Sequence, residues 1–347
     1  MQDLDKISHV YILSFERSGS TLLSSMLNAH PNIITANEEP FAYFLYKKYK
    51  KYKNWDKTIV LRYVDDFYFF WENKFNEQFG TKDQLLNSLL AFPKLNVEKA
   101  IKLTYLNFFP QKNKDNVTTI IDKQIRHHYI LKDLQLQFPA AKFIVLVRDP
   151  RDTVAIKLNR ARKAKTRQDV YSASVNWNYV FKTIIQDTKK VPKDKIHYVK
   201  YENLVINTEE ELKKISEFLN IDYDSNTLNF NEGINSEYLK FTESSKQLFD
   251  KIHSSLKTKV NANKVGIWEK DLSETQAEIV TNICGEVAYK YGYETKTTNS
   301  IRFNKSYIRA MFFLNKKNIL TKIYNLLIIY KAFSFLKPIN KVSDLPG

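Results

Sequence analysis

The chain has 347 residues and a formal net charge of +16, with 43% apolar and 14% aromatic residues. This composition excludes an intrinsically disordered chain, a collagen-like chain and a small disulfide scaffold. The one cysteine, Cys284, cannot form an internal disulfide, so we expect a reducing compartment. The charge predicts an anionic partner. Five of the ten arginines, whose planar guanidinium suits phosphate or sulfate, fall between residues 148 and 167.

The N-terminal segment MQDLDKISHV lacks the layout of a signal peptide, because no basic stretch precedes an apolar one and a small-residue cleavage site. No run in the sequence approaches the roughly 18 apolar residues of a membrane-spanning helix. We therefore expect a cytoplasmic protein, either soluble or peripheral at the inner face of the membrane.

Short apolar runs alternate with helical patterns along the chain. The predicted strands are 10–15, 118–121, 142–147 and 196–199. The predicted helices are 21–29, 129–138, 150–163, 169–191, 208–219 and 273–291. Strands that alternate with helices predict an α/β fold of three layers, in which helices cover both faces of a central parallel sheet.

Two segments fall outside this alternation. Residues 41–109 are aromatic-rich and mostly helical in pattern, which predicts a helical insertion within a single α/β domain covering 1–300. Residues 301–347 are predicted as a separate basic tail, and 301–340 hold eight Lys or Arg and no Asp or Glu. Two interpretations of this tail stay open: a basic amphipathic helix on an anionic membrane, or a helix packed on the domain with its lysines in solvent.

The first motif is HVYILSFERSGSTLL at residues 9–23, which predicts a strand, a tight loop and a helix start. From Ser14 to Thr21 it follows the P-loop spacing G-x-x-x-x-G-K-S/T, with Gly19 at the second glycine and Ser20 at the lysine. Such a loop points backbone N–H groups and a helix dipole at an anion. The P-loop lysine is missing, and Arg17 supplies a cation inside the loop instead. That placement favours a group attached to a 5′-phosphate over a magnesium-bound γ-phosphate; the alternative is a serine-capped helix with no ligand.

The second motif is AAKFIVLVRDPRDTVAIKLNR at residues 140–160. It places Arg148 at the carboxyl end of a buried strand, the edge at which open parallel sheets bind ligands. Pro150 suits the first position of the next helix, and Arg160 lies further along that helix. The alternative is a surface network of ion pairs, comprising Arg148, Asp149, Arg151 and Asp152.

Together the two motifs resemble the sulfotransferases that use 3′-phosphoadenosine 5′-phosphosulfate (PAPS), a family with a P-loop-like fold. The resemblance implies that Arg148 and Arg160 bind the 3′-phosphate. It also implies that the first loop binds the 5′-phosphosulfate through Arg17, Ser18, Gly19, Ser20 and Thr21.

Further segments extend the resemblance over about residues 9–294, more weakly in 41–109. SGSTLLSSMLNAHPNIITANEEP is similar to the tyrosylprotein-type branch, whose catalytic carboxylate 21 residues after the loop arginine corresponds to Glu38, with Glu39 as the alternative. IIDKQI resembles the segment whose lysine contacts the transferred group, here Lys123. VKYENLV and VNANKVGIWEKDLS resemble two segments that contact the nucleotide, here through Tyr201 and Lys264.

Two positions depart from the family pattern. A serine that commonly binds the 3′-phosphate eight residues after the second-motif arginine is replaced by Ile156, for which Lys157 or Arg160 could compensate. The strand-end lysine is followed by Gln124 and Ile125 where a proline is common.

The resemblance implies an in-line sulfotransferase, without a metal, that moves a sulfuryl group from PAPS to a hydroxyl of a carbohydrate, a lipid or a peptide tyrosine. Glu38 would take the acceptor proton, while Arg17 and Lys123 stabilise developing charge. A P-loop phosphotransferase is the main alternative, with Asp122 and Asp149 as magnesium ligands after two strands. A binder of nucleic acid or membrane without catalysis is the other alternative; we expect no nucleic-acid partner.

Overall fold

The computed structural model describes residues 3–35, 41–70, 78–166, 168–294 and 305–329. Its centre is a five-stranded sheet of order β2-β3-β1-β4-β5, in which every neighbouring pair is parallel. The strands are β1 (Ser8–Ser14), β2 (Ile33–Thr35), β3 (Thr119–Lys123), β4 (Lys142–Val147) and β5 (Ile196–Lys200). Because all five are parallel, their carboxyl ends share one edge of the sheet.

The central strand β1 sends alternate side chains into two hydrophobic cores. Val10 and Ile12 join one core, and Tyr11 and Leu13 join the other. This follows from the two-residue repeat of a strand. Since both faces are covered, the strand is a continuous apolar run, as is usual for a buried parallel sheet.

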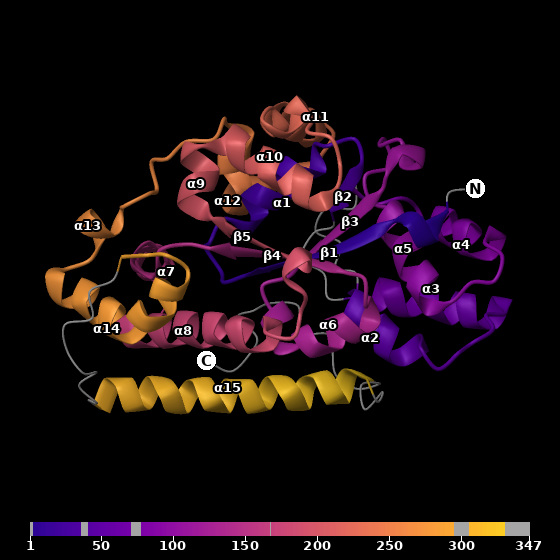
Figure 1. Cartoon of the computed structure of the whole chain (residues 1–347). Helices are drawn as coiled ribbons and strands as arrows, with labels where there is room; N and C mark the ends of the chain where they lie inside the picture. Colours follow the sequence, from indigo (N-terminus) through magenta and orange to yellow (C-terminus); the bar gives the residue numbers. More distant parts are fainter. Residues whose placement is uncertain (1–2, 36–40, 71–77, 167, 295–304, 330–347) are drawn as a thin grey trace.

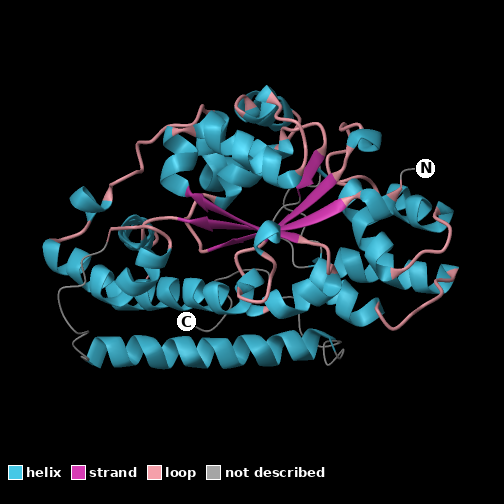
Figure 2. Ribbon diagram, viewed as in Figure 1, coloured by secondary structure: helices cyan, strands magenta, loops and turns pink. Residues whose placement is uncertain are grey.

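Helices form a layer on each face of the sheet (Figures 1 and 2). One layer holds α1 (Ser20–Asn28), α9 (Tyr201–Ile206), α10 (Thr208–Leu219), α11 (Phe230–Leu239) and α12 (Glu243–His253). The other holds α6 (Leu131–Gln137), α7 (Pro150–Lys163), α8 (Val170–Thr188) and α14 (Glu274–Lys290). The predicted three-layer α/β fold with a parallel sheet is confirmed.

Within its described residues, the aromatic-rich segment forms four helices to one side of the sheet: α2 (Phe41–Tyr49), α3 (Lys57–Phe70), α4 (Lys82–Ala91) and α5 (Val97–Leu106). The basic tail forms α15 (Lys305–Ile329), which packs along α8 and touches α2 (Figure 1). Among the described residues, no helix combines the length and the apolar character needed to span a bilayer. The division into a domain at 1–300 and a tail stays a prediction.

The observed bounds of β4 and α7 agree with the predicted ones, 142–147 and 150–163, and the start of α7 shows the reason. Helix α7 begins at Pro150, and the Asp149 side chain caps it by accepting the N–H of Arg151 at 2.8 Å. Strand β2 was not predicted, because its three residues are too few to show a periodicity. Residues 127–129 form a 3₁₀ turn before α6, so the predicted helix at 129–138 starts later.

Candidate active site at the carboxyl edge of the sheet

Three of the predicted site residues and the start of the first loop lie at the carboxyl ends of four adjacent strands. Ser14 ends β1 and leads into the first loop, and Lys123 ends β3. Arg148 follows β4, and Tyr201 follows β5 as the first residue of α9. The sheet order β3-β1-β4-β5 therefore brings them to one edge, as expected for a ligand site in an open parallel sheet.

The loop between β1 and α1 is shaped to receive an anion. Arg17 and Gly19 both have left-handed backbone angles, with φ of 67° and 93°, and Gly19 caps α1 without a side-chain hydrogen bond to the helix. Helix α1 therefore presents its first N–H groups and the positive end of its dipole uncapped. The buried hydroxyls of Ser14 and Ser18 have no hydrogen-bond partner among the described residues. Unpaired buried donors beside an uncapped helix are typical of a phosphate-binding site.

Close packing explains why residue 19 is glycine. A Cβ atom on Gly19 would lie 2.5 Å from Cδ2 of Tyr201, a distance that no real Cβ contact allows. The same tyrosine ring stacks on Arg148, whose guanidinium carbon lies 4.1 Å from the ring centroid. Gly19, Tyr201 and Arg148 therefore form one packed column that joins β1, β4 and β5.

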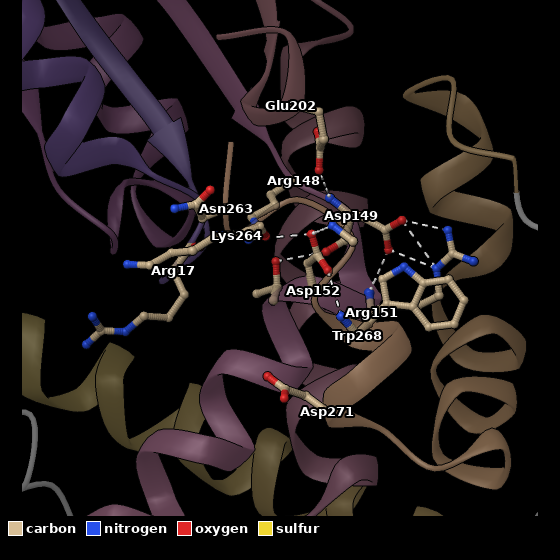
Figure 3. Close-up of polar contacts among 12 residues, drawn as sticks. Arg17, Arg148, Asp149, Arg151, Asp152, Glu202, Asn263, Lys264, Trp268 and Asp271 are labelled. Carbon is tan, nitrogen blue, oxygen red and sulfur yellow. Dashed lines mark hydrogen bonds and ion pairs between the residues drawn. The ribbon is translucent and has the colours of Figure 1, made fainter. Parts of the chain in front are cut away.

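The guanidinium of Arg148 is buried and links three segments (Figure 3). It donates to the backbone carbonyl of Arg17 at 3.3 Å and to the carbonyl of Lys264, and it faces the Asp152 carboxylate at 3.5 Å. The first loop, the start of α7 and the loop at 261–268, which we call the late loop, therefore meet at one side chain. The Nε of Arg148 has no partner among the described residues, so the guanidinium retains a donor.

Asp152 fixes the late loop at 261–268 to α7. Its two carboxylate oxygens accept the N–H of Gly266 at 3.0 Å and that of Trp268 at 3.1 Å. Burial raises the pKa of Asp152, and those N–H groups and Arg148 only partly oppose this effect. The sequence predicts Asp152 only as part of the alternative surface network. Arg148 lies before the helix cap at Asp149, so the four-residue spacing of a helix surface did not indicate this pair.

The remaining members of the RDPRD motif form a structural ion pair. Asp149 accepts the Nη2 of Arg151 at 2.6 Å and its Nε at 3.0 Å, and the guanidinium carbon of Arg151 lies 4.2 Å from the ring centroid of Trp268. Glu202 accepts the backbone N–H of Asp149 at 3.0 Å. The predicted ion pairs thus exist, Asp149 with Arg151 and Arg148 with Asp152. The second pair is buried rather than on the surface, and Arg148 also contacts the first loop.

Two of the three predicted catalytic residues lie at this edge. Lys123 is buried, and its Nζ lies 3.2 Å from the hydroxyl of Thr21, at the start of α1. Arg17 is exposed, and its side chain extends away from the Arg148 contacts (Figure 3). Glu38 and its alternative Glu39 lie outside the described residues. Their roles stay predictions.

The two predicted substitutes for Ile156 differ in position. The ammonium of Lys157 forms an ion pair with Glu16 in the first loop and lies 4.7 Å from the ring centroid of Phe15. Arg160 is exposed, and ten further residues of α7 place it about 15 Å along the helix from Pro150. Lys157 therefore contacts the first loop, while the structure does not bring Arg160 to it. Lys264 reaches the site through its carbonyl, and its side chain is exposed.

Both carboxylates of the phosphotransferase alternative are already engaged. Asp149 pairs with Arg151, and Asp122 is buried 3.4 Å from the Nε2 of His127. Burial is the largest single influence and would raise the pKa of Asp122, but His127, His9 and Tyr105 together outweigh it and the pKa is lowered. Within the described ranges, no three His, Cys, Asp or Glu side chains gather as a metal site would require. The arrangement favours binding of an anionic group by cations and N–H donors.

Comparison with known proteins agrees with this geometry. Residues 9–225 match the family model described as the sulfotransferase family. The chain is 26% identical over 234 residues to a protein-tyrosine sulfotransferase of Drosophila melanogaster, covering 65% of this chain and 40% of that protein. It is 24% identical over 237 residues to protein-tyrosine sulfotransferase A of Caenorhabditis elegans, covering 66% and 54%. The chain thus spans about half the length of these curated relatives.

A solved structure shares the fold. The sulfotransferase domain of the Synechococcus PCC 7002 olefin synthase superposes with a TM-score of 0.53 at 19% identity, covering 83% of this chain and 96% of that domain. At 19% identity this similarity shows a shared arrangement of helices and strands.

Proposed function

The chain belongs to the sulfotransferase family, and from that premise we propose that it transfers a sulfuryl group from PAPS to a hydroxyl of an acceptor. One observation carries the proposal: Arg148 donates to the carbonyl of Arg17, so the two anion-binding segments adjoin. A nucleotide with phosphates at both its 3′ and 5′ positions is a ligand that suits two adjoining anion sites.

The first loop would bind the 5′-phosphosulfate. The uncapped N–H groups of α1 and the unpartnered Ser18 hydroxyl are donors that need no rearrangement to meet an anion. Thr21 and Lys123, 3.2 Å apart, stand beside them. Arg17 adds a cation that is exposed and so can reach the bridging oxygen. The N–H groups, Ser18, Thr21 and Lys123 are held in place before the reaction, which is the condition for electrostatic catalysis, and Arg17 would join them when the nucleotide binds.

The Arg148 guanidinium would bind the 3′-phosphate. Its present acceptors include two backbone carbonyls, those of Arg17 and Lys264. A phosphate is a stronger acceptor for a guanidinium than a neutral carbonyl. Binding would therefore displace the Lys264 carbonyl and shift the late loop, which leaves the exposed Lys264 side chain free to approach the nucleotide.

The reaction would be a direct displacement at sulfur. The acceptor oxygen forms a bond to sulfur as the bond from sulfur to the bridging phosphate oxygen breaks, which gives a sulfate ester and 3′-phosphoadenosine 5′-phosphate (PAP). The acceptor proton passes to the Glu38 carboxylate. Arg17 and Lys123 stabilise the charge that develops on the bridging and sulfuryl oxygens, in the way that cations act in phosphoryl transfer.

A peptide tyrosine is the acceptor we propose first, because both relatives described above are protein-tyrosine sulfotransferases. Carbohydrate and lipid hydroxyls are the competing acceptors. The test is incubation with labelled PAPS and a panel of tyrosine peptides, glycans and lipid extracts. Transfer to a tyrosine peptide supports the proposal, and transfer only to a glycan or a lipid overturns the acceptor. Transfer of phosphate from ATP with magnesium, without use of PAPS, would overturn the reaction class.

A further inference from the structure

The orientation of α15 separates the two interpretations of the basic tail. A helix that merely packs on a domain should bury its large apolar side chains. The side toward α8 carries the buried residues Ala310, Leu314, Asn318 and Thr321, which we call the inner stripe. Tyr307 and Met311 are partly buried and pack against the same core.

Four other large apolar residues of α15 lie on the opposite side of the helix. Ile308, Phe312, Ile319 and Ile323 are 58%, 65%, 59% and 47% exposed, and we call them the outer stripe. Their spacings of four, seven and four residues place them in one row along a helix. At 100° per residue, this row lies roughly opposite the inner stripe. The helix thus turns a row of isoleucine and phenylalanine toward solvent.

A row of cations runs beside the outer stripe. Lys305, Arg309 and Lys316 repeat with spacings of four and seven residues and are all exposed; we call them the basic row. The guanidinium of Arg309 also lies 5.5 Å from the ring centroid of Phe313, which is exposed on the same helix. No Asp or Glu occurs between residues 301 and 340. The face therefore combines apolar side chains with positive charge and lacks negative charge.

We propose that this face of α15 docks on an anionic lipid membrane. Phenylalanine and isoleucine side chains can enter the boundary between head groups and acyl chains, while a basic row beside them contacts anionic head groups. A second copy of the chain is a poorer fit, because a two-fold contact would set each basic row against its own like charge. Since α15 is the outermost layer of the molecule (Figure 1), a flat surface can reach it without a change in fold.

The test is sedimentation of the full chain with vesicles of phosphatidylcholine alone and of phosphatidylcholine with about 30% phosphatidylserine. We expect binding to the anionic vesicles that falls as salt is raised. Phe312→Ser with Ile319→Ser should weaken this binding at least about tenfold, through the loss of apolar insertion. Lys305→Glu with Lys316→Glu should weaken it by about tenfold or more.

Leu239→Ser and Tyr289→Ser are matched controls, because both residues are exposed apolar side chains on other helices. They should leave vesicle binding unchanged. All these side chains are exposed, so unchanged circular dichroism is expected for each variant.

Three results would overturn the proposal. They are no binding to anionic vesicles, binding that survives both pairs of α15 substitutions, and a dimer in light scattering that the Phe312→Ser and Ile319→Ser pair dissolves. Use of PAPS plays no part in the measurement, so docking and the proposed reaction can fail separately.

Discussion

The Nη1 atom of Arg148 donates to the backbone carbonyl of Arg17 at 3.3 Å. Residues 131 positions apart in the sequence are thereby joined at the carboxyl edge of the sheet. The contact ties the loop after β1 to the loop after β4, and Tyr201 packs on both of them.

Removal of the loop cation should affect catalysis more than folding. Arg17→Ala should lower kcat by about 10²–10³, the scale of losing one group that stabilises charge in the transition state. Because the side chain is exposed, the urea midpoint should stay unchanged. Arg62→Ala on α3 is the control, since Arg62 is also exposed. A variant that retains full kcat would remove Arg17 from the reaction.

Gly19 should not tolerate even one methyl group. Gly19→Ala would force a non-glycine residue to φ 93° and push against the Tyr201 ring. We expect a loss of about 1–3 kcal/mol in the free energy of unfolding by urea and a higher KM for PAPS. Gly233→Ala is the control, because nothing lies within 4 Å of the added carbon, and it should be neutral or mildly stabilising in α11. Equal effects of the two substitutions would contradict the claim that packing against Tyr201 excludes a side chain at residue 19.

Asp152 should position the late loop without touching the reacting atoms. Asp152→Asn removes a charge facing Arg148 and weakens the acceptors for Gly266 and Trp268. We expect KM for PAPS to rise about tenfold or more, with faster hydrogen exchange at residues 261–268 and little change in kcat. Glu269→Gln, an exposed neighbour, should change none of these. A fall in kcat with KM and exchange unchanged would rule out a positioning role.

Acid should destabilise the protein through buried neutral histidines. Burial lowers the pKa of both His9 and His128 to about 3, against an ordinary value of 6.5. Between pH 3 and 6.5 the unfolded chain therefore binds protons that the folded chain does not, so stability is full above 6.5 and falls as the pH drops. Each histidine should contribute about 1.4 kcal/mol per pH unit in that window.

His9→Phe isolates one of these contributions. The His9 ring stacks on Phe138 with centroids 4.2 Å apart, and neither of its nitrogens has a hydrogen-bond partner among the described residues. Urea unfolding at a series of pH values should therefore give a shallower slope for the variant, by about 1.4 kcal/mol per unit. An unchanged slope would mean that His9 titrates normally in the folded protein.

The parts of the site that depend on short-range sequence patterns could be predicted from the sequence. Arg148 could be placed because an apolar strand precedes it and a proline starts the helix after it. The N–H donors of the first loop followed in the same way from Ser14, Gly19 and the spacing to Thr21. The parallel sheet then determined that these strand ends would meet.

Other features depended on contacts between distant segments. The carbonyl of Lys264, rather than only its side chain, meets Arg148, and a sequence pattern does not indicate the position of a carbonyl. The packing of Tyr201 on Gly19 joins residues 182 positions apart by their numbering. The sequence also did not determine which side of α15 faces the domain, because apolar residues occur on both sides of that helix.

We propose that the first loop and Arg148 bind one nucleotide at both its phosphate positions. Isothermal titration of the full chain with PAP and with adenosine 5′-phosphate compares ligands that differ only in the 3′-phosphate. We predict a micromolar Kd for PAP and binding of adenosine 5′-phosphate at least about tenfold weaker, the loss expected for one charged hydrogen-bonded group. Equal affinity for the two nucleotides, or no binding of PAP at micromolar concentration, would contradict the account.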